Sequence, residues 1–267
     1  MTKLKLTSRY VIYTYLLFWV MVLGICGMAS MVFHVSPIVM RWLSNLCAWS
    51  PTIVLFAMFK KLMPGITVKE FYKKAFSGKI RIHIMLLVPI AIVGGMLVSV
   101  FILSLIERKA FSSFWSMGAY SLPLTILLSL LSGPTGEESG WRGYLRCELE
   151  KKYDFFRASV YLGVIWAFWH TVLWFVDSDF VGGEMLIYVI SNVVVMTALT
   201  IIMNVIMRKY DNLLYAVWVH FCFNFTYGFI NADIWFYAVM SIVYVIIAGV
   251  FFCLSKRDKN YEKINII

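Results

Sequence analysis

Apolar stretches long enough to cross a bilayer recur along this chain, and they constrain its fold more than any other feature. A helix needs about 20 consecutive, mostly apolar residues to span the hydrocarbon core. The pattern predicts eight such spans with soft boundaries, at residues 10–33, 37–60, 82–106, 117–138, 158–176, 185–207, 213–230 and 234–255. Because lipid offers no hydrogen-bond partners to the backbone, we expect an all-α fold, a polytopic membrane bundle of about eight transmembrane helices.

Composition leaves little room for a soluble domain. Of the 267 residues, 61% are hydrophobic and 14% are charged, whereas soluble domains average about 45 to 50% apolar and about 25% charged residues. The sequence has no visible internal repeat, so we expect residues 1–267 to form a single integral membrane domain. The five cysteines are scattered without a CxxC pair, which argues against a disulfide framework and against a thiolate metal site.

The distribution of basic residues predicts an orientation. If the N-terminus lies inside, all of the 24 Lys and Arg residues except Arg41, Arg108 and Lys109 fall on the inner side. Cytoplasmic loops of membrane proteins carry this excess, so we expect a multi-pass protein of the cell membrane with both termini cytoplasmic. The net charge of +10 then indicates contact with anionic membrane lipid and not with nucleic acid. The polar connection 60–81 is expected to form an amphipathic segment at the membrane surface.

Two adjacent carboxylates and an arginine stand at the end of the fourth span. They lie in the stretch Gly-Glu-Glu-Ser-Gly-Trp-Arg-Gly-Tyr-Leu, as Glu137, Glu138 and Arg142. Ionised groups in or beside hydrocarbon are costly and are therefore paired or functional. On a helix, Glu138 and Arg142 are i,i+4 neighbours that can pair, while Glu137 points about 100° away. Glu137 is thus the candidate proton acceptor, and a simple ion-paired helix end would leave it without a partner.

Two further polar positions lie deep in apolar spans. His170 in the fifth span has tryptophans at i−4 and i+4, Trp166 and Trp174, so we expect its imidazole to lie between them. In the seventh span, i,i+4 spacing places His220 and Asn224 on one helical face. Taken singly, each is compatible with an ordinary hydrogen-bonded residue inside a bundle.

Together these residue types suit peptide-bond hydrolysis. A glutamate can activate water as a general base, and histidine with asparagine can polarise a carbonyl or stabilise the oxyanion that develops on it. A bound divalent ion can supply the same polarisation.

The three motifs resemble those of the CPBP family of intramembrane proteases, named for CAAX prenyl proteases and bacteriocin-processing enzymes and also called Abi. The resemblance runs from about residue 120 to 230 and comprises EExxxR as Glu137, Glu138 and Arg142, an aromatic-xxx-His as Trp166 and His170, and HxxxN as His220 and Asn224.

The resemblance implies specific roles for these residues. It makes Glu137 the general base of a membrane-embedded cavity that His170, His220 and Asn224 line, with support from Arg142. The family usually has Phe where this chain has Trp166, so we expect an aromatic wall of larger size at the substrate.

The family is often described as metal-dependent, and two accounts of the chemistry stay open. His170, His220 and Glu137 can ligate zinc, although they do not form the HExxH arrangement. Alternatively, Glu137 and His170 activate water and His220 with Asn224 forms an oxyanion site without a metal.

The predicted function is that of an intramembrane endopeptidase acting on a peptide or protein. Small bacterial family members lead us to expect peptide maturation or bacteriocin self-immunity. One alternative is a non-catalytic immunity or scaffold protein that binds a peptide in the same cavity. Another is a small transporter that uses the buried Glu and His residues as a proton relay, although the chain lacks the repeats that many transporters show.

Overall fold

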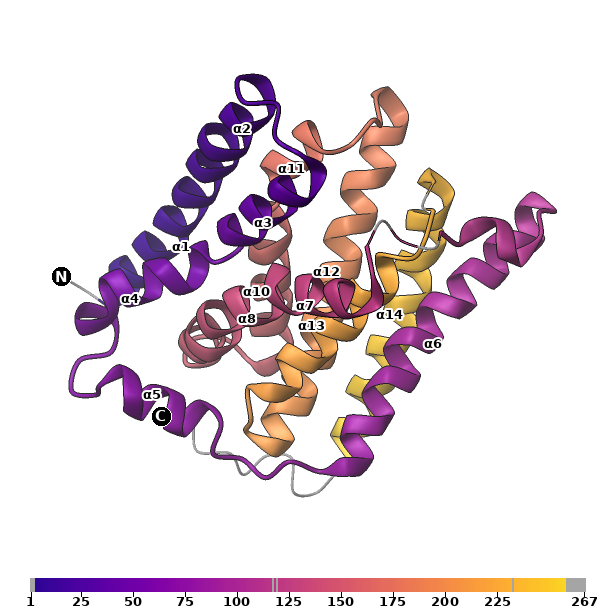
Figure 1. Cartoon of the computed structure of the whole chain (residues 1–267). Coiled ribbons are helices and arrows are strands. Elements are labelled where there is room, and N and C mark those ends of the chain that lie inside the picture. The colour runs from indigo at the N-terminus through magenta and orange to yellow at the C-terminus, as the bar shows by residue number, and fades with distance from the viewer. Residues whose placement is uncertain (1–2, 117, 119, 232, 258–267) are drawn as a thin grey trace.

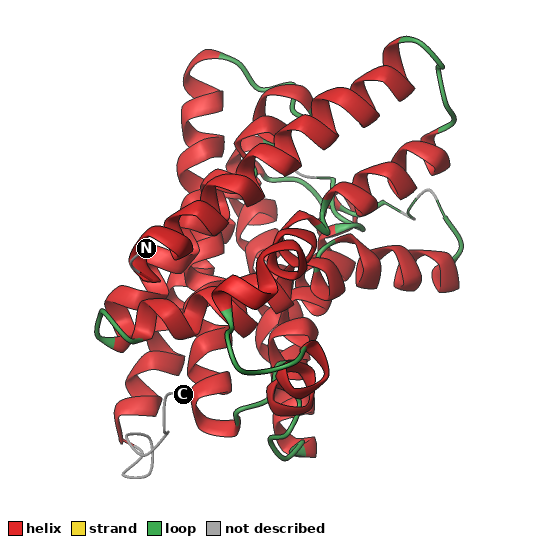
Figure 2. Cartoon of the chain, turned by 90° about the vertical axis from the view of Figure 1, so that its left-hand side faces the viewer, coloured by secondary structure: helices red, strands yellow, loops and turns green. Residues whose placement is uncertain are grey.

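The computed structural model describes residues 3–116, 118, 120–231 and 233–257. Met117, where the fourth expected span begins, and Lys259 and Lys263, counted among the basic residues, lie outside this part of the chain. The described residues form helices joined by loops and contain no strand, as Figure 2 shows. The predicted all-α fold is confirmed.

The elements follow one another along the chain as α1 Lys3–Val20, η1 Met21–Cys26, α2 Gly27–Met31, α3 Pro37–Cys47, α4 Ser50–Leu62, α5 Val68–Ala75, α6 Ile82–Glu107, η2 Phe111–Phe114, α7 Leu122–Ser132, α8 Pro134–Glu138, η3 Ser139–Leu145, α9 Arg146–Glu150, α10 Phe155–Trp169, α11 Thr171–Val176, α12 Gly182–Tyr210, α13 Leu214–Tyr227 and α14 Ile234–Arg257.

Six helical segments of the described chain are long and apolar enough to cross a membrane. They are Lys5–Met31, Pro37–Leu62, Ile82–Glu107, Phe155–Val176, Gly182–Tyr210 and Ile234–Arg257. These segments match six of the eight expected spans. The chain is therefore a multi-pass membrane bundle, whereas the count of eight full-length spans is not reproduced.

The two remaining expected spans are short helices. α7 has 11 residues and α13 has 14, which at 1.5 Å per residue gives lengths of about 16 and 21 Å, less than the roughly 30 Å of a hydrocarbon core. The fourth span is interrupted at Gly133, because its φ of −150° with a ψ of −50° is not a helical conformation. Pro134 then begins a new helix, and it has no N–H to donate to the preceding turn. Apolar length alone does not reveal such a break.

These short helices lie inside the bundle. α8 contacts α4, α7 and α13, and α13 also contacts α6 and α12. Figure 1 shows α7, α8 and α13 in the middle of the molecule, with α1 and α6 toward its edges. The elements that carry the motif residues are therefore surrounded by the longer apolar helices.

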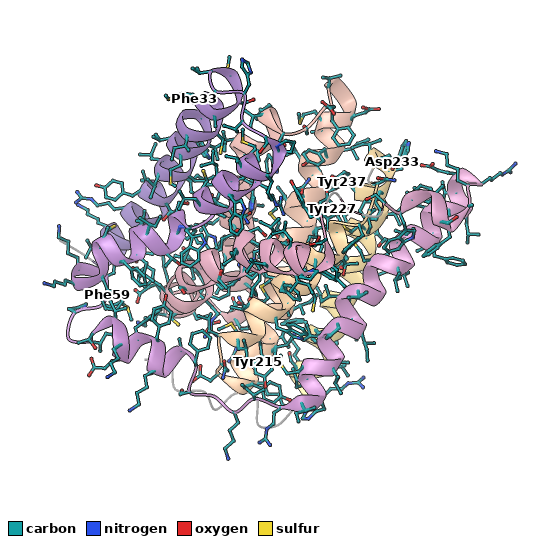
Figure 3. The ribbon with its side chains drawn as sticks, in the orientation of Figure 1. Phe33, Phe59, Tyr215, Tyr227, Asp233 and Tyr237 are labelled. Atoms are coloured by element: carbon teal, nitrogen blue, oxygen red, sulfur yellow. The ribbon has the colours of Figure 1, made fainter. Side chains whose placement is uncertain are left out.

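Tyrosine hydroxyls hold α13 at both ends. At its start, the Tyr215 hydroxyl accepts from the Arg81 N–H at 2.7 Å and donates to the Lys79 carbonyl at 3.1 Å. At its other end, the Tyr227 and Tyr237 hydroxyls share a hydrogen bond between α13 and α14. Figure 3 shows Tyr215 and Tyr227 far apart along the bundle, with Tyr237 beside Tyr227. The position of α13 is thus fixed along its length.

The polar connection expected to be amphipathic forms α5. Its first turn is a capping box in which Thr67 and Glu70 bond each other's backbone N–H, and the Thr67 N–H lowers the pKa of the exposed Glu70 carboxyl. Phe71 is buried, and the Tyr72 hydroxyl lies 3.1 Å from that of Ser139. α5 therefore rests its apolar side against η3, the turn that follows the carboxylate pair.

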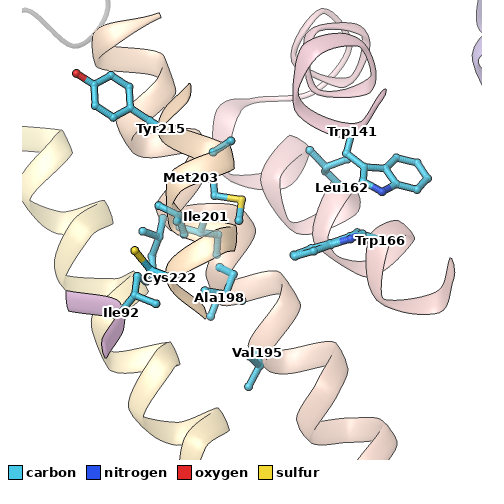
Figure 4. Packing of buried hydrophobic residues seen from close by; sticks show 14 of the residues in the cluster. Ile92, Trp141, Leu162, Trp166, Val195, Ala198, Ile201, Met203, Tyr215 and Cys222 are labelled. Carbon is cyan, nitrogen blue, oxygen red and sulfur yellow. The ribbon is translucent and has the colours of Figure 1, made fainter. Parts of the chain in front are cut away.

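Large aromatic side chains fill the interior around η3 and α10. Trp141, Trp166 and Trp169 are each no more than 2% exposed, and the rings of Trp141 and Trp169 meet edge to face at 6.0 Å. Figure 4 shows Trp141, Leu162 and Trp166 gathered beside the apolar residues of α12. This packing places α10 directly against the helices that hold the carboxylates.

Candidate active site

Four elements bring the motif residues together. Glu137 and Glu138 end α8, Arg142 lies in the π-helical turn η3, and His170 follows α10 directly. His220 lies in the middle of α13 and Asn224 one turn further.

Glu138 is the anchor of the cluster. Its Oε1 accepts from Arg142 Nη1 at 3.1 Å and lies 2.7 Å from Nδ1 of His220. All three residues are at most 4% exposed. Arg142 Nη2 also donates to the Thr200 hydroxyl on α12 at 2.7 Å. The predicted pairing of Glu138 with Arg142 is confirmed, and it is extended to His220 and Thr200, which the sequence did not connect to it.

Glu137 has a different partner. Its Oε2 accepts a 2.6 Å hydrogen bond from the indole N–H of Trp166, a residue only 2% exposed. The guanidinium of Arg142 lies 4.0 Å from the centre of the Trp166 ring, a cation–π contact. Trp166 was expected to form an aromatic wall for the substrate, but the structure shows it contacting Glu137 through its polar edge. The two glutamates are thus held by different neighbours.

His170 lies at the break between α10 and α11. Its Nδ1 is 3.0 Å from the carbonyl oxygen of Trp166, and because a carbonyl only accepts, Nδ1 carries the proton and Nε2 keeps a lone pair. The centre of the imidazole lies 4.6 Å from the ring centre of Trp169 and 6.0 Å from that of Trp166.

The expectation that His170 lies between Trp166 and Trp174 is wrong. The Trp174 ring packs on Phe168 at 5.8 Å, and among the described residues no ring contact joins it to His170. The backbone relation is kept, since the Trp174 N–H donates to the His170 carbonyl at 3.3 Å, but the Trp174 side chain packs on Phe168 and not on the imidazole.

His220 and Asn224 share one face of α13, as predicted. Nε2 of His220 and Oε1 of Glu137 both approach Gly133, each 2.7 Å from the point that a Cβ on Gly133 would occupy. The Asn224 side-chain amide donates to the Ser132 hydroxyl at 3.4 Å. The missing side chain of Gly133 therefore lets the imidazole and the carboxylate approach the same point.

Sequence reasoning missed Ser132, Gly133 and Thr200. Ser132 and Gly133 directly precede the Pro-Thr-Gly-Glu-Glu run and were not singled out. Thr200 gave no signal, since one threonine in a long apolar helix is unremarkable. Its contact with Arg142 joins residues 58 positions apart.

The three side chains proposed as zinc ligands do not fit a metal site in this arrangement. Across the described ranges, no group of three or more His, Cys, Asp or Glu side chains is placed to hold a metal ion. The chemistry proposed below therefore uses the side chains of this chain alone.

The fold and the site define a class of protein. A multi-pass helical bundle that gathers two carboxylates, an arginine and two imidazoles from separate helices has the residue types that an intramembrane hydrolase needs. Such groups are expensive inside a membrane and therefore mark candidate functional sites.

Comparison with known proteins then shows what the chain is similar to. A family model described as Type II CAAX prenyl endopeptidase Rce1-like matches residues 119–226, a range that contains every motif residue. CAAX prenyl protease 2 of Methanococcus maripaludis is 26% identical over 223 residues, which cover 80% of this chain and 79% of the relative. The resemblance to the CPBP family predicted from the motifs is confirmed, and these matches support a membrane-embedded protease.

Proposed function

We propose that this protein is an intramembrane endopeptidase in which Glu137 activates the water that attacks the scissile peptide bond. The observation that carries the proposal is that the two adjacent carboxylates have different hydrogen-bond donors. Arg142 donates a hydrogen bond to Glu138. Glu137 instead accepts from a neutral donor, the indole N–H of Trp166, which sets its orientation. A neutral donor fixes the direction of the carboxylate without neutralising its charge, which suits a general base.

His170 assists at the water. Its Nδ1 donates to the Trp166 carbonyl, so its Nε2 presents a lone pair that accepts a hydrogen bond from the water. Glu137 takes one proton as the water oxygen bonds to the carbonyl carbon. The same proton then passes to the leaving amine when the C–N bond breaks, so that Glu137 is regenerated.

His220 and Asn224 stabilise the oxyanion. Nδ1 of His220 donates to Glu138, and we propose that its Nε2 carries a second proton directed at the developing negative charge. The Asn224 amide, oriented by Ser132, supplies another donor. Preorganised donors of this kind are worth about 2.7 to 4 kcal/mol each in known enzymes. Arg142 and Thr200 act indirectly, by holding Glu138.

The substrate is a peptide or protein segment that reaches the site from the membrane. The curated relative is named a CAAX prenyl protease, so a prenylated C-terminal peptide is the first substrate to test. Maturation of a secreted peptide and self-immunity against bacteriocins are the next roles to test. Both termini are proposed to be cytoplasmic because basic residues concentrate on that side.

Cleavage in liposomes tests the proposal. The wild-type protein and Glu137→Gln are reconstituted and given a fluorogenic peptide with and without a farnesyl group. We expect Glu137→Gln to reduce kcat by about 10² to 10⁴, the contribution of a general base. Glu184→Gln, which changes an exposed glutamate on α12, is the matched control and should cleave normally. Full cleavage by Glu137→Gln would show that Glu137 is not the base, and absence of cleavage by the wild type would favour a non-catalytic binding protein instead.

A further inference from the structure

The first helix of the chain contacts the turn that carries His170. Phe18 and Trp19 of α1 both contact Trp169, the last residue of α10, and His170 follows it directly. α1 lies outside residues 119–226, which match the family model. Figure 1 shows α1 toward one edge of the bundle. A helix outside the matched region therefore reaches one side of the candidate site.

Two side chains of α1 donate hydrogen bonds to backbone carbonyls of α10. The Trp19 indole N–H donates to the Trp169 carbonyl at 3.1 Å, and the Tyr15 hydroxyl donates to the Ile165 carbonyl. The two donors are four residues apart on α1 and the two acceptors four residues apart on α10, so each pair lies on one helical face. The two helices therefore run side by side in the same direction, and their register is fixed at two points.

The bond from Trp19 uses a carbonyl that the helix break makes available. In a continuous α-helix, the Trp169 carbonyl would accept from the N–H of the residue four positions later, Leu173. Here the Leu173 N–H donates to the His170 carbonyl at 2.8 Å. Trp169 is fully buried, and a buried carbonyl without a donor is costly. The indole of Trp19 therefore supplies, from another helix, a donor in place of the one that the break redirects.

The peptide group that Trp19 binds is also held on its other side. The peptide bond between Trp169 and His170 forms one planar unit. Its carbonyl accepts from Trp19 at 3.1 Å, and its N–H, that of His170, donates to the Ala167 carbonyl at 3.0 Å. Because the Cα of His170 belongs to the same planar unit, these two bonds fix the point from which the imidazole side chain starts.

Two aromatic rings, one from each helix, pack against the imidazole. Phe18 is 2% exposed, and its ring stacks on that of Trp169 with the ring centres 3.8 Å apart. The centre of the imidazole lies 6.3 Å from the ring centre of Phe18, at an interplanar angle of 73°. The Trp169 ring meets the imidazole at 80°. Together with the Nδ1 bond to the Trp166 carbonyl, these contacts restrict the direction in which Nε2 points.

We infer that Trp19 is a positioning residue of the candidate active site, which holds the peptide group between Trp169 and His170 and thereby orients the His170 imidazole. The inference rests on the proposed function, in which Nε2 of His170 accepts a hydrogen bond from the attacking water. Trp19 acts on the reaction only through His170. The first helix is accordingly part of the hydrolytic unit and not only a membrane anchor.

Cleavage kinetics of Trp19→Phe test the inference. The substitution keeps an aromatic ring and removes the N–H donor. We expect kcat to fall about three- to tenfold, the effect of one neutral hydrogen bond, while KM stays unchanged. Trp218→Phe is the matched control, because it removes an indole donor to another helix, the bond to the Met85 carbonyl at 2.9 Å, and it should cleave normally. A kcat that Trp19→Phe leaves unchanged, or that Trp218→Phe lowers equally, would overturn the role of Trp19.

The imidazole of His170 gives a second readout that does not depend on activity. Nitrogen NMR of protein labelled at histidine distinguishes the two imidazole tautomers, and His170→Gln identifies the His170 signals. We expect Trp19→Phe to shift these signals while those of His83, at the start of α6, keep their wild-type positions. Trp218→Phe should leave the His170 signals unchanged. Thermal unfolding in detergent confirms that the variants are folded.

The two readouts separate this inference from the proposed function. Unshifted His170 signals in folded Trp19→Phe would overturn the inference, even if the wild type cleaves its peptide. Absence of cleavage by the wild type would contradict the proposed function, whereas the His170 signals would still decide whether Trp19 orients the imidazole.

Discussion

The indole nitrogen of Trp166 donates a 2.6 Å hydrogen bond to Oε2 of Glu137, a residue 29 positions earlier in the chain. This bond joins α10 to α8 and sets the direction of the carboxylate that we propose as the base. Arg142 lies over the same indole ring. Trp166 therefore contacts both the proposed base and the arginine that holds Glu138.

Replacing Trp166 with phenylalanine tests this coupling. Trp166→Phe keeps an aromatic ring but removes the donor to Glu137, and a hydrogen bond to a charged group is worth about 1.5 to 3 kcal/mol. We expect kcat to fall by about one to two orders of magnitude while KM stays nearly constant, as steady-state cleavage of the peptide would show. Trp218→Phe is the control, since its indole donates to the distant Met85 carbonyl. An equal loss of kcat in both variants would contradict a specific role for Trp166.

The buried pair of Glu138 and Arg142 is expected to dominate local stability. Arg142→Gln leaves the Glu138 charge buried without its main partner, which costs about 3 to 5 kcal/mol in comparable pairs. The double variant with Glu138→Gln should lose less than the sum of the two single losses, because the contact is shared. Thermal unfolding in detergent gives the comparison.

Arg157→Gln provides the reference for that experiment. Arg157 forms an exposed pair with Asp154, and exposed pairs contribute about 0 to 1 kcal/mol. If Arg142→Gln were no more destabilising than Arg157→Gln, the structural role assigned to the buried pair would be wrong.

Gly133 is expected to tolerate no side chain. The Cβ of Gly133→Ala would lie 2.6 Å from Cε1 of His220 and 2.7 Å from Oε1 of Glu137, so one of the two groups has to move. A displacement of about 1 Å in a reacting group can cost a hundredfold in rate, and we expect a loss of that order in the cleavage assay. Gly94→Ala meets no atom and should leave activity unchanged while stabilising its helix by up to about 1 kcal/mol. Normal cleavage by Gly133→Ala would show that the close approach is dispensable.

Treatment with a chelator tests whether cleavage depends on a bound metal ion. Since the described His, Cys, Asp and Glu side chains form no metal-ligand group, we expect cleavage to persist after prolonged treatment with a strong chelator. Activity is measured before treatment, after it, and after zinc is added back. Loss of cleavage that zinc restores would show that the side chains rearrange around a metal.

The capping box of α5 predicts a pH dependence. The Thr67 N–H lowers the pKa of Glu70 in the folded protein. The ionised carboxylate therefore stabilises α5 at a pH above the pKa that Glu70 has in the unfolded chain, and this stabilisation is lost as the pH falls through the lower pKa of the folded state. Backbone amide hydrogen exchange in α5, corrected for intrinsic rates, should therefore become faster as the pH is lowered from 7 to 3. Glu70→Gln should largely remove this change, and a pH response unaltered by that substitution would point to another group.

The sequence by itself determined the class of fold and the identities of the motif residues. Apolar length is a local property, so the spans could be located without knowledge of their neighbours. The pairing of Glu138 with Arg142 was also local, since it needs only one helical turn. The lengths of the fourth and seventh spans were overestimated, because the helices break at Gly133 and at the ends of α13 although the sequence stays apolar there.

Only the tertiary structure decided how the polar groups are shared. His220 binds Glu138 across 82 positions, and Arg142 reaches Thr200 across 58. Spacing along a helix carries no information about contacts between helices, so neither partner could be assigned from the pattern. The same is true of Trp166, whose aromatic character was visible in the sequence, whereas the direction of its N–H toward Glu137 depends on how α10 packs against α8.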